Sequence, residues 1–547
     1  MNRFIKNFFI AVWVTPIILY SQVTDTLIVV KPLDPVVKTS QKILDQPNVK
    51  DTIEVKQEIK YTFVEVPFQA ARIIDTIAPV KVKSEAVNKL YHQYVRLGVG
   101  SNFNKIFSAS INGGRSSKYR YSMWYDHFSS NGLARLNYDN FSHNQAGGDF
   151  TVFWDETMFT AKLNYTRNAF HYYGIFDRDN RNIEITDRTF LLNHFVYINP
   201  EFRFKDNLEE NSLKLRHDNI LGYTYTTNAN QVNEHFFNYR GNWGKRINRD
   251  LYTVSVYGDY NSFRNKLSER NGIVKITPHI RSTGKRLDAD LGFSVNMQFD
   301  TIAHFYFFPD LHVKYELVKD AFIPFVNVKG GVVRNNLRNF SMVNNFIDTS
   351  AHIQNTIDKF EIQGGWRVSF SRRIYFVLDA TFKNVQNMPF WIKNYNDPWQ
   401  NKFILVYDNM DWLKFRFNFA YDENERMKAG LYVYYNDYRT QNEKRAWHMP
   451  VFEYGGWIMY NLADKFIGQI NLHGFDKQYV KLPDYMNQSE GMKLKGFTDL
   501  NLRFEYRYTD RISAFVSFNN ILSQSYQRWQ DYNTQRFNLM GGFTFGF

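Results

Sequence analysis

The sequence predicts an all-β protein, a transmembrane antiparallel up-and-down β-barrel of about 22 strands, with roughly 20 to 24 accepted. Three observations predict this fold. Many segments alternate between an apolar, aromatic-rich face and a polar face. The connectors alternate between tight turns and longer loops. The last segment is an amphipathic strand that stops on an aromatic residue.

Composition excludes several other classes of protein. The chain has 547 residues, a net charge of +13, 18% aromatic residues and no cysteine. Its mean hydropathy is −0.47, and no apolar run of about 20 residues, as a membrane helix requires, follows the N-terminal segment. A polytopic helical membrane protein is therefore excluded. The absence of cysteine excludes disulfide scaffolds, thiolate zinc sites and cysteine nucleophiles. The basic residues are spread along the chain, which argues against a nucleic-acid partner.

The first element is predicted to be a signal peptide at residues 1–21. Arg3 and Lys6 form a basic start, residues 8–20 are apolar, and a polar stretch follows directly. An uncleaved N-terminal membrane anchor is the alternative. The signal predicts that the mature chain leaves the cytoplasm.

Residues 22–90 differ in character from the rest of the chain. Five prolines interrupt this segment, and charges are scattered through it. We expect an extended periplasmic N-terminal arm, or alternatively a reduced plug that enters the barrel. The barrel itself is predicted to occupy residues 91–547.

The strands of the barrel follow from a period of two. Apolar and aromatic side chains alternate with polar ones through residues 500–508, and residues 95–100, 360–370 and 413–421 repeat the pattern. A half-exposed sheet of a soluble protein would also alternate. The length of the strands and the aromatic ends of their apolar faces favour a barrel with a lipid-facing outer wall.

The polar faces predict the wall of the lumen. They carry both signs of charge, as expected for a water-filled wall crossed by ion pairs. The residual positive charge predicts a preference for anionic solutes or anionic lipid headgroups. The predicted charged wall residues are Arg367, Lys414, Arg416, Arg503, Glu505 and Arg507.

The connectors predict which ends of the strands share a side of the membrane. Every second connector is a short polar turn, as at residues 115–118, 155–158, 247–250, 283–286, 371–373, 422–426, 462–465 and 509–511. Many of the others are long, as at residues 131–143, 177–193, 335–358, 387–401, 438–448, 477–492 and 523–534. Outer-membrane barrels have short periplasmic turns and long extracellular loops. With an even strand count, the N-terminal arm and the C-terminus are both expected in the periplasm.

The final strand has the sharpest local pattern. Phe543, Phe545 and Phe547 share one face with Phe537 and Leu539, and the chain ends there. This strand resembles the C-terminal assembly signal of outer-membrane barrels. The resemblance implies that the barrel-assembly machinery recognises it during biogenesis by pairing with its edge.

Candidate catalytic and metal sites are weak. His127 and Ser129 share a strand face, but no third residue of a triad can be assigned. Asp177, Asp179 and Asn180 have calcium-like spacing without the remaining ligands. We expect no enzyme activity, no catalytic residue, no cofactor and no metal. Residues 171–173 (His-Tyr-Tyr) are expected in an aromatic girdle or at the base of a loop.

Residues 94–547 resemble the barrel of TonB-dependent receptors, especially plug-poor barrels of Bacteroidetes-type bacteria. The resemblance rests on strand number, connector parity, the terminal Phe547 and the segments 125–132 and 165–174. It implies energised uptake of a substrate across the cell outer membrane. It also implies a TonB-type energy transducer as partner, with outer-membrane lipid and lipopolysaccharide around the barrel.

The sequence departs from that family before the barrel, because residues 22–90 are too short for a standard plug of about 120 to 150 residues. The candidate energy-coupling box is formed by Asp25, Thr26, Leu27, Ile28, Val29 and Val30, which would add a strand to a partner's sheet. An ordinary extended stretch is the other interpretation. The predicted function is passage or uptake of a substrate. The alternative is a non-enzymatic scaffold or accessory subunit of an envelope protein complex, such as an outer-membrane assembly or surface-lipoprotein complex.

Overall fold

The structure is a computed structural model that describes residues 92–547 except 115, 133–138, 175–190, 207, 209–212, 231, 265–267, 301, 424–425 and 484–489. The predicted signal peptide, the arm or reduced plug and the candidate energy-coupling box lie outside the described residues. So do Asp177, Asp179 and Asn180.

Twenty-two strands form one sheet. The first eleven are β1 (Gln93–Gly100), β2 (Lys105–Asn112), β3 (Tyr119–Ser130), β4 (Phe141–Phe153), β5 (Thr157–His171), β6 (Leu192–Asp206), β7 (Arg216–Asn228), β8 (Asn233–Ile247), β9 (Asp250–Arg264), β10 (Ser268–Thr283) and β11 (Leu287–Phe299). The others are β12 (Ala303–Tyr315), β13 (Phe322–Val333), β14 (Thr356–Ser369), β15 (Ile374–Lys393), β16 (Phe403–Glu423), β17 (Met427–Thr440), β18 (Phe452–Leu462), β19 (Phe466–Phe475), β22 (Phe497–Arg507), β23 (Ile512–Asn519) and β26 (Asn538–Gly546).

The connectors contain the remaining elements. They are the 3-10 turn η1 (Ser101–Phe103), the helix α2 (Leu337–Val343), the hairpin of β20 (Gln478–Val480) and β21 (Met492–Leu494), and the hairpin of β24 (Gln527–Trp529) and β25 (Tyr532–Asn533). No helix in the described ranges combines the length and the apolar character needed to cross a membrane.

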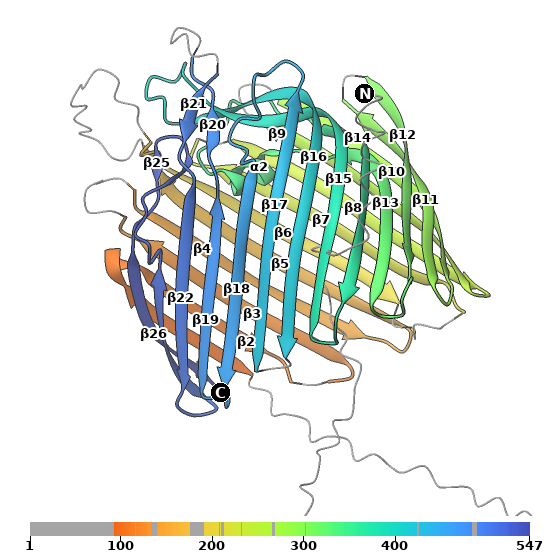
Figure 1. Ribbon diagram of the computed structural model, residues 1–547, viewed down its shortest axis with the longest axis horizontal. Coiled ribbons are helices and arrows are strands. Elements are labelled where there is room, and N and C mark those ends of the chain that lie inside the picture. The colour runs from red at the N-terminus through yellow and green to blue at the C-terminus, as the bar shows by residue number, and fades with distance from the viewer. Residues whose placement is uncertain are drawn as a thin grey trace, which may run out of the picture. The chain divides into compact units, whose positions relative to one another are not determined.

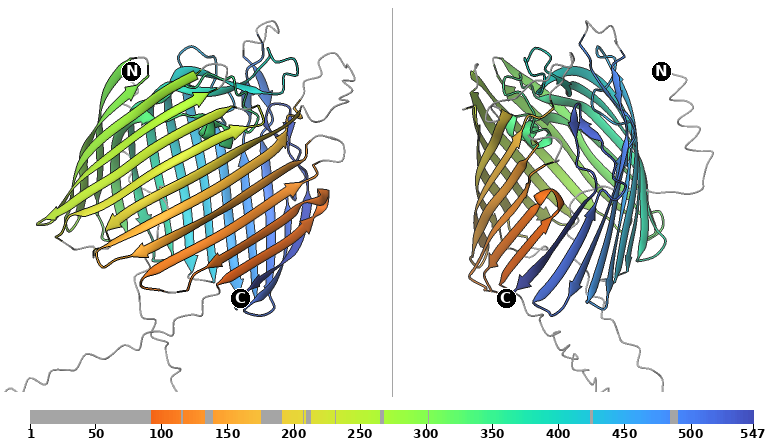
Figure 2. Two further views of the ribbon diagram at one scale, coloured as in Figure 1. Left: turned by 180° about the vertical axis from the view of Figure 1, so that it is seen from behind. Right: turned by 90° about the vertical axis from the view of Figure 1, so that its left-hand side faces the viewer.

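The sheet closes into a barrel. Each strand pairs antiparallel with the next one along the chain, and β26 pairs with β1, so that Gly542 lies opposite Gly98 (Figures 1 and 2). The predicted antiparallel up-and-down barrel of about 22 strands is confirmed.

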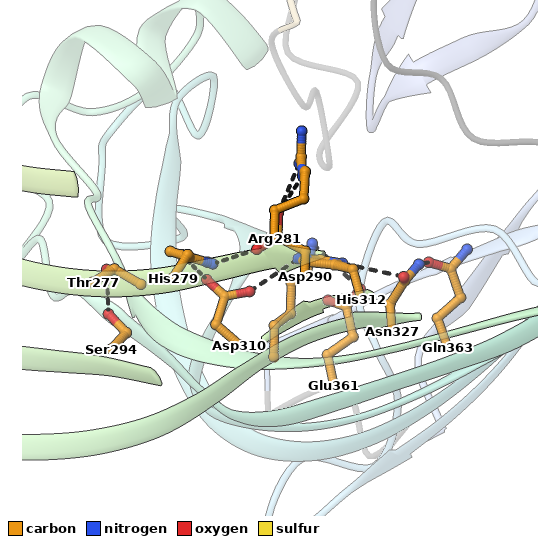
Figure 3. A network of polar contacts seen from close by, with 11 residues as sticks. Thr277, His279, Arg281, Asp290, Ser294, Asp310, His312, Asn327, Glu361 and Gln363 are labelled. Atoms are coloured by element: carbon orange, nitrogen blue, oxygen red, sulfur yellow. Dashed lines mark hydrogen bonds and ion pairs between the residues drawn. The ribbon is translucent and has the colours of Figure 1, made fainter. Parts of the chain in front are cut away.

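The two faces of the wall differ as the alternation predicts. Large apolar side chains point outward and are exposed, for example Val99 at 67% and Phe543 at 68%. Residues of the other parity line the lumen and are mostly polar, and Figure 3 draws a polar network on this face of β10–β14. This polarity is the reverse of a soluble sandwich, because apolar exposure on a whole outer wall requires lipid.

The ends of the barrel differ in the same way as the predicted connectors. The C-terminus lies at the end with the short turns, and α2, β20 and β21 lie at the opposite end (Figure 1). The predicted start of the loop at residue 387 is wrong, because β15 continues to Lys393. A bulge between Val385 and Met388 takes up Asn387, Pro389 stays in register opposite Tyr407, and the extended strand buries Phe390 and Trp391 at the mouth of the barrel.

Candidate functional site: the lumen and its mouth

Inward side chains of β10, β11 and β12 form a polar network on the lumen wall (Figure 3). His279 Nδ1 lies 3.1 Å from Asp290 Oδ1, and its Nε2 lies 3.5 Å from Asp310 Oδ2. The other oxygen of Asp310 lies 2.9 Å from His312 Nε2. Arg281 Nη2 donates to Asp290 Oδ2 at 2.7 Å. Each carboxylate therefore has a cation or imidazole partner, and the described residues contain no group of three metal-binding side chains placed to hold an ion.

The network continues across β13 to β15. Asn327 Oδ1 accepts from His312 Nδ1 at 3.1 Å, and Asn327 Nδ2 donates to Gln363 Oε1 at 2.9 Å. Glu361 is paired with Lys383 at 2.5 Å and with Lys329 at 3.7 Å. This part of the wall is a continuous band of hydrogen bonds and ion pairs. Such a band keeps a wide lumen polar without leaving buried charges uncompensated.

The structure places the predicted charged wall residues on inward faces in two separate regions. Arg367 on β14 stacks over Tyr375 at 5.4 Å. On β16, Arg416 Nε donates to Asp379 Oδ1 at 2.9 Å, and Lys414 lies 4.5 Å from the Tyr434 ring.

The other three predicted wall residues lie on β22. Arg503 Nη2 donates to Glu505 Oε2 at 3.1 Å, and Arg507 follows on the same face. Glu505 also accepts from Ser513 on β23 at 3.0 Å. The sequence pattern therefore located these side chains on one face but could not assign their partners.

Phe543, Phe545 and Phe547 lie on the outward face of the closing strand and its end. They are 68%, 41% and 45% exposed. The carbonyl of Phe547 accepts hydrogen bonds from the backbone N–H groups of His92 and Gln93 at 3.0 and 2.9 Å. In the closed barrel, the edge of the last strand is therefore paired with the first strand.

The mouth at the loop end is filled by a large apolar cluster, which we call the mouth cluster. It brings together connectors and strand ends that are far apart in the sequence. Its aromatic contacts include Phe346 on Tyr532 with ring centroids 3.6 Å apart, and Trp391 on Trp529 at 5.4 Å. Its buried members are Phe170, Tyr172, Leu191, Phe195, Tyr197, Val232, Phe263, Leu337, Phe340, Ile347, Ala351, Ile353, Trp391, Phe403, Leu405, Trp529 and Tyr532.

The loop between β13 and β14 (residues 334–355) folds into the mouth and is held to the wall at two buried points. Glu234 on β8 accepts hydrogen bonds from the backbone N–H groups of Leu337 and Arg338, at 2.8 and 3.0 Å, at the start of α2. Arg334 pairs with Asp259 on β9, with side chains only 7% and 0% exposed. A carboxylate at a helix start satisfies N–H groups that have no partner within the helix.

A third buried point joins three connectors. The Lys393 ammonium at the end of β15 is fully buried, pairs with Asp531 and donates to the Gly174 carbonyl at 3.1 Å. Nearby, Asn401 Nδ2 donates to the Tyr172 carbonyl at 2.9 Å. These contacts tie the connectors after β5, β15 and β23 to one another at the mouth.

A polar cavity of about 790 Å³ lies beside the mouth cluster. Its lining comes from the connectors after β7, β13 and β15 and from the end of β9, and includes Arg264, Asp348, Asn394, Asp397 and Lys402. Lys402 pairs with Asp397 at 3.2 Å, and Asp348 accepts from Asn394 at 2.9 Å. Hydrogen bonds from the Ser350 N–H and hydroxyl, followed by Asn394 and the nearby Lys402 ammonium, hold the pKa of the Asp348 carboxyl below its usual range despite its burial. The guanidinium of Arg264 has no ion-pair partner within the described ranges, so the cavity can accept a polar, hydrogen-bonding solute with an anionic group.

His448 in the β17–β18 loop (residues 441–451) is expected to make the mouth sensitive to acid. It packs against Phe403 and Trp529, and burial together with the nearby Arg528 lowers its pKa to about 3. The ordinary histidine pKa is about 6.5, so the exposed ring binds a proton more readily than the packed ring. The packing of the His448 ring is therefore fully stable above about pH 6.5. It weakens as the pH falls from there towards the lowered pKa of about 3.

Hydrogen exchange of residues 441–451 measures this effect. We expect exchange, corrected for its intrinsic pH dependence, to speed up about tenfold or more between pH 7.5 and pH 5 in the natural protein. His448→Phe should show no such change. Equal changes in both proteins would contradict the assignment.

The weak catalytic candidates have structural roles. His127 Nε2 lies 3.0 Å from Ser129 Oγ, and His127 Nδ1 lies 2.7 Å from Asn144 Oδ1, on the outward face of β3 and β4. Tyr172 and Tyr173, expected in a girdle or at a loop base, lie at the base of the β5–β6 connector in the mouth cluster.

Sequence reasoning missed Glu234, Asp259 and Lys393 as the residues that hold the loops to the wall and to one another. The available signal is the density of Trp, Phe and Tyr in the long connectors.

Comparisons with known proteins agree with this architecture. No family model and no curated protein matches the chain. Among solved structures, the FrpB iron transporter from Neisseria meningitidis (F3-3 variant) matches with a TM-score of 0.67 at 9% identity, over 84% of this chain and 82% of that chain. The described barrel has the fold of TonB-dependent receptors.

Two further structures show the same fold. The ferric-catecholate import receptor Fiu from E. coli K12 has a TM-score of 0.63 at 8% identity, covering 84% of this chain and 82% of that one. The copper transporter OprC has a TM-score of 0.62 at 11% identity, covering 84% and 80%. At these identities, the likeness establishes the barrel and leaves the substrate open.

Proposed function

We propose that this protein is an outer-membrane barrel of the TonB-dependent receptor type that takes up a substrate or lets it pass across the outer membrane, and that it is not an enzyme. The observation that carries this proposal is a closed 22-stranded barrel with a polar lumen and a mouth filled by packed loops. Barrels of this size are wide enough for large solutes and need an element that closes them. The barrel neighbours are described as transporters and receptors for iron, siderophore or copper.

The remaining parts of the chain fit the same proposal. Residues 1–21 direct export, residues 22–90 form a periplasmic arm or a reduced plug, and Asp25 to Val30 contact a TonB-type transducer. The C-terminus lies on the periplasmic side, and the barrel-assembly machinery recognises the outward Phe543, Phe545 and Phe547. Lipopolysaccharide surrounds the loop end. The plug-poor, Bacteroidetes-type character belongs to this proposal as well. The polar cavity with Arg264 is the first contact for the substrate.

A second function is favoured by the mouth itself. Three buried polar anchors and a large aromatic cluster close it, which suits a rigid platform. In that case the protein is a scaffold or accessory subunit of an envelope protein complex.

Planar-bilayer conductance of the full mature chain distinguishes the two functions. We expect the natural protein to be closed and Lys393→Met to open in large steps at least about tenfold more often, because the variant leaves Asp531 without its cation and frees three connectors. Arg439→Gln, which removes an exposed pair with Asp437 near the same rim, is the matched control. If Lys393→Met stays closed although hydrogen exchange shows its loops released, the scaffold becomes the better assignment.

A further inference from the structure

The outer wall carries an apolar groove near the end with the short turns. It has a volume of about 620 Å³ and crosses β8 to β12. Its outward side chains include Trp243, Tyr252, Val254, Ile280, Leu291 and Phe293. We call it the turn-side groove. Tyr252, Ile280 and Leu291 are 42%, 46% and 48% exposed, so the groove is open to the surroundings of the barrel.

The register of the strands explains the depression. Val254 lies directly opposite Trp243 on β8 and opposite Pro278 on β10. A small side chain and a proline ring therefore stand between the larger indole of Trp243 and the Phe293 ring on β11. Such a hollow accommodates an extended hydrocarbon chain, whereas a flat wall contacts lipid only along its surface.

Unpaired cations lie at the turn end of the strands that form this groove. Lys245 belongs to the groove lining. Arg249 lies in the β8–β9 turn, and Lys285 and Arg286 lie in the β10–β11 turn, all of them exposed. None of these four has an ion-pair partner within the described part of the chain, whereas the neighbouring Lys314 is paired with Asp288 at 2.7 Å. The groove therefore combines an apolar slot with an excess of positive charge at one end.

We propose that the turn-side groove binds an anionic phospholipid, with one acyl chain in the slot and its phosphate held by Lys245 and the cations of the two turns. Long basic side chains at the edge of a lipid-facing wall extend towards headgroups, and basic clusters next to an apolar surface select anionic lipids. Trp243 and Tyr252 stand at the level where aromatic side chains mark the interface. The site rests on the proposed membrane location of the barrel and is independent of whether the barrel transports a substrate.

Native mass spectrometry of the full chain in detergent tests the site. The protein is mixed with phosphatidylglycerol or with zwitterionic phosphatidylcholine, and the fraction that retains one lipid is measured. We expect clear retention of phosphatidylglycerol and no clear retention of phosphatidylcholine. Removing charge in Lys245→Gln/Lys285→Gln should weaken retention roughly fivefold for each cation. Val254→Trp, which fills the slot and leaves every charge, should weaken it by at least about tenfold.

The control is Lys118→Gln/Arg511→Gln, which removes two exposed cations from turns elsewhere on the same end. It should retain phosphatidylglycerol as the natural protein does. A shift in gel mobility on heating establishes that each variant is a folded barrel. Equal retention of both lipids, equal loss in the control, or preferential retention of lipopolysaccharide in competition would each overturn the phospholipid site. None of these results would bear on conductance, so the transport proposal is tested separately.

Discussion

Replacing Arg334 with methionine is expected to release the β13–β14 loop from the barrel wall while the barrel stays folded. Arg334 Nε donates to Asp259 Oδ2 at 3.1 Å, and the guanidinium also contacts Asn271 and Asn355. The variant leaves the Asp259 carboxylate buried without its cation, since its remaining donors are the Tyr257 hydroxyl at 2.6 Å and the Ile273 N–H at 3.1 Å. Losing one partner of a buried pair costs about 3 to 5 kcal/mol.

Hydrogen exchange of residues 334–355 measures the release directly. The N–H groups of α2 should lose protection by a factor of 100 or more, roughly what about 3 kcal/mol gives, while those of the strands keep theirs. The double variant Arg334→Met/Asp259→Asn should recover much of the protection, because no buried charge remains unpaired.

The matched control for this prediction is Arg281→Met. Arg281 is 55% exposed and pairs with Asp290 on the open lumen wall. Its loss should cost less than about 1 kcal/mol, because solvent screens the pair. Unchanged protection of α2 in Arg334→Met would show that apolar packing alone holds the loop.

The barrel could be predicted from the sequence because its wall is locally encoded. A period of two assigns Leu502 and Phe504 to one face and Arg503 and Glu505 to the other, whatever the strand pairs with. Short polar turns then force neighbouring strands to pair, so strand order follows chain order. The period of two also predicts that Arg416 points inward. It does not predict the partner Asp379, because the register between two strands is not encoded in either strand alone.

The packing of loops in the mouth could not be predicted, because its contacts join distant segments. Arg334 and Asp259 are 75 residues apart, and Lys393 and Asp531 are 138 apart. Each of these residues also fits a wet lumen wall or a solvated loop, so residue type alone does not indicate burial. The apolar residues between 334 and 355 were the informative signal, because a solvated loop gains nothing from Leu337, Phe340 and Ile347.

Replacing Gly542 with alanine is expected to weaken the seam where the last strand meets the first. A Cβ at Gly542 would lie 2.0 Å from the Leu97 carbonyl oxygen and 2.7 Å from the Gly98 Cα, which are backbone atoms of β1. The Phe515 ring also lies 2.7 Å from that position. Arg96 and Arg503 stack on this ring at 4.6 and 4.7 Å, which limits its movement. Relief therefore requires β1 and β26 to separate.

We expect Gly542→Ala to lower the free energy of unfolding by about 2 to 3 kcal/mol and to reduce the yield of closed barrel, because overpacking against backbone cannot be relieved by a rotamer change. Urea titration of the protein in detergent, followed by the shift in gel mobility on heating, measures both quantities.

Gly541→Ala is the matched control. It adds the same methyl group one residue earlier on the outward face, where the nearest atom is the Phe515 carbonyl oxygen at 3.7 Å. It should change stability by less than about 0.5 kcal/mol. Equal effects of the two substitutions would mean that loss of glycine flexibility in β26, rather than the close approach of β1, sets the stability of the seam.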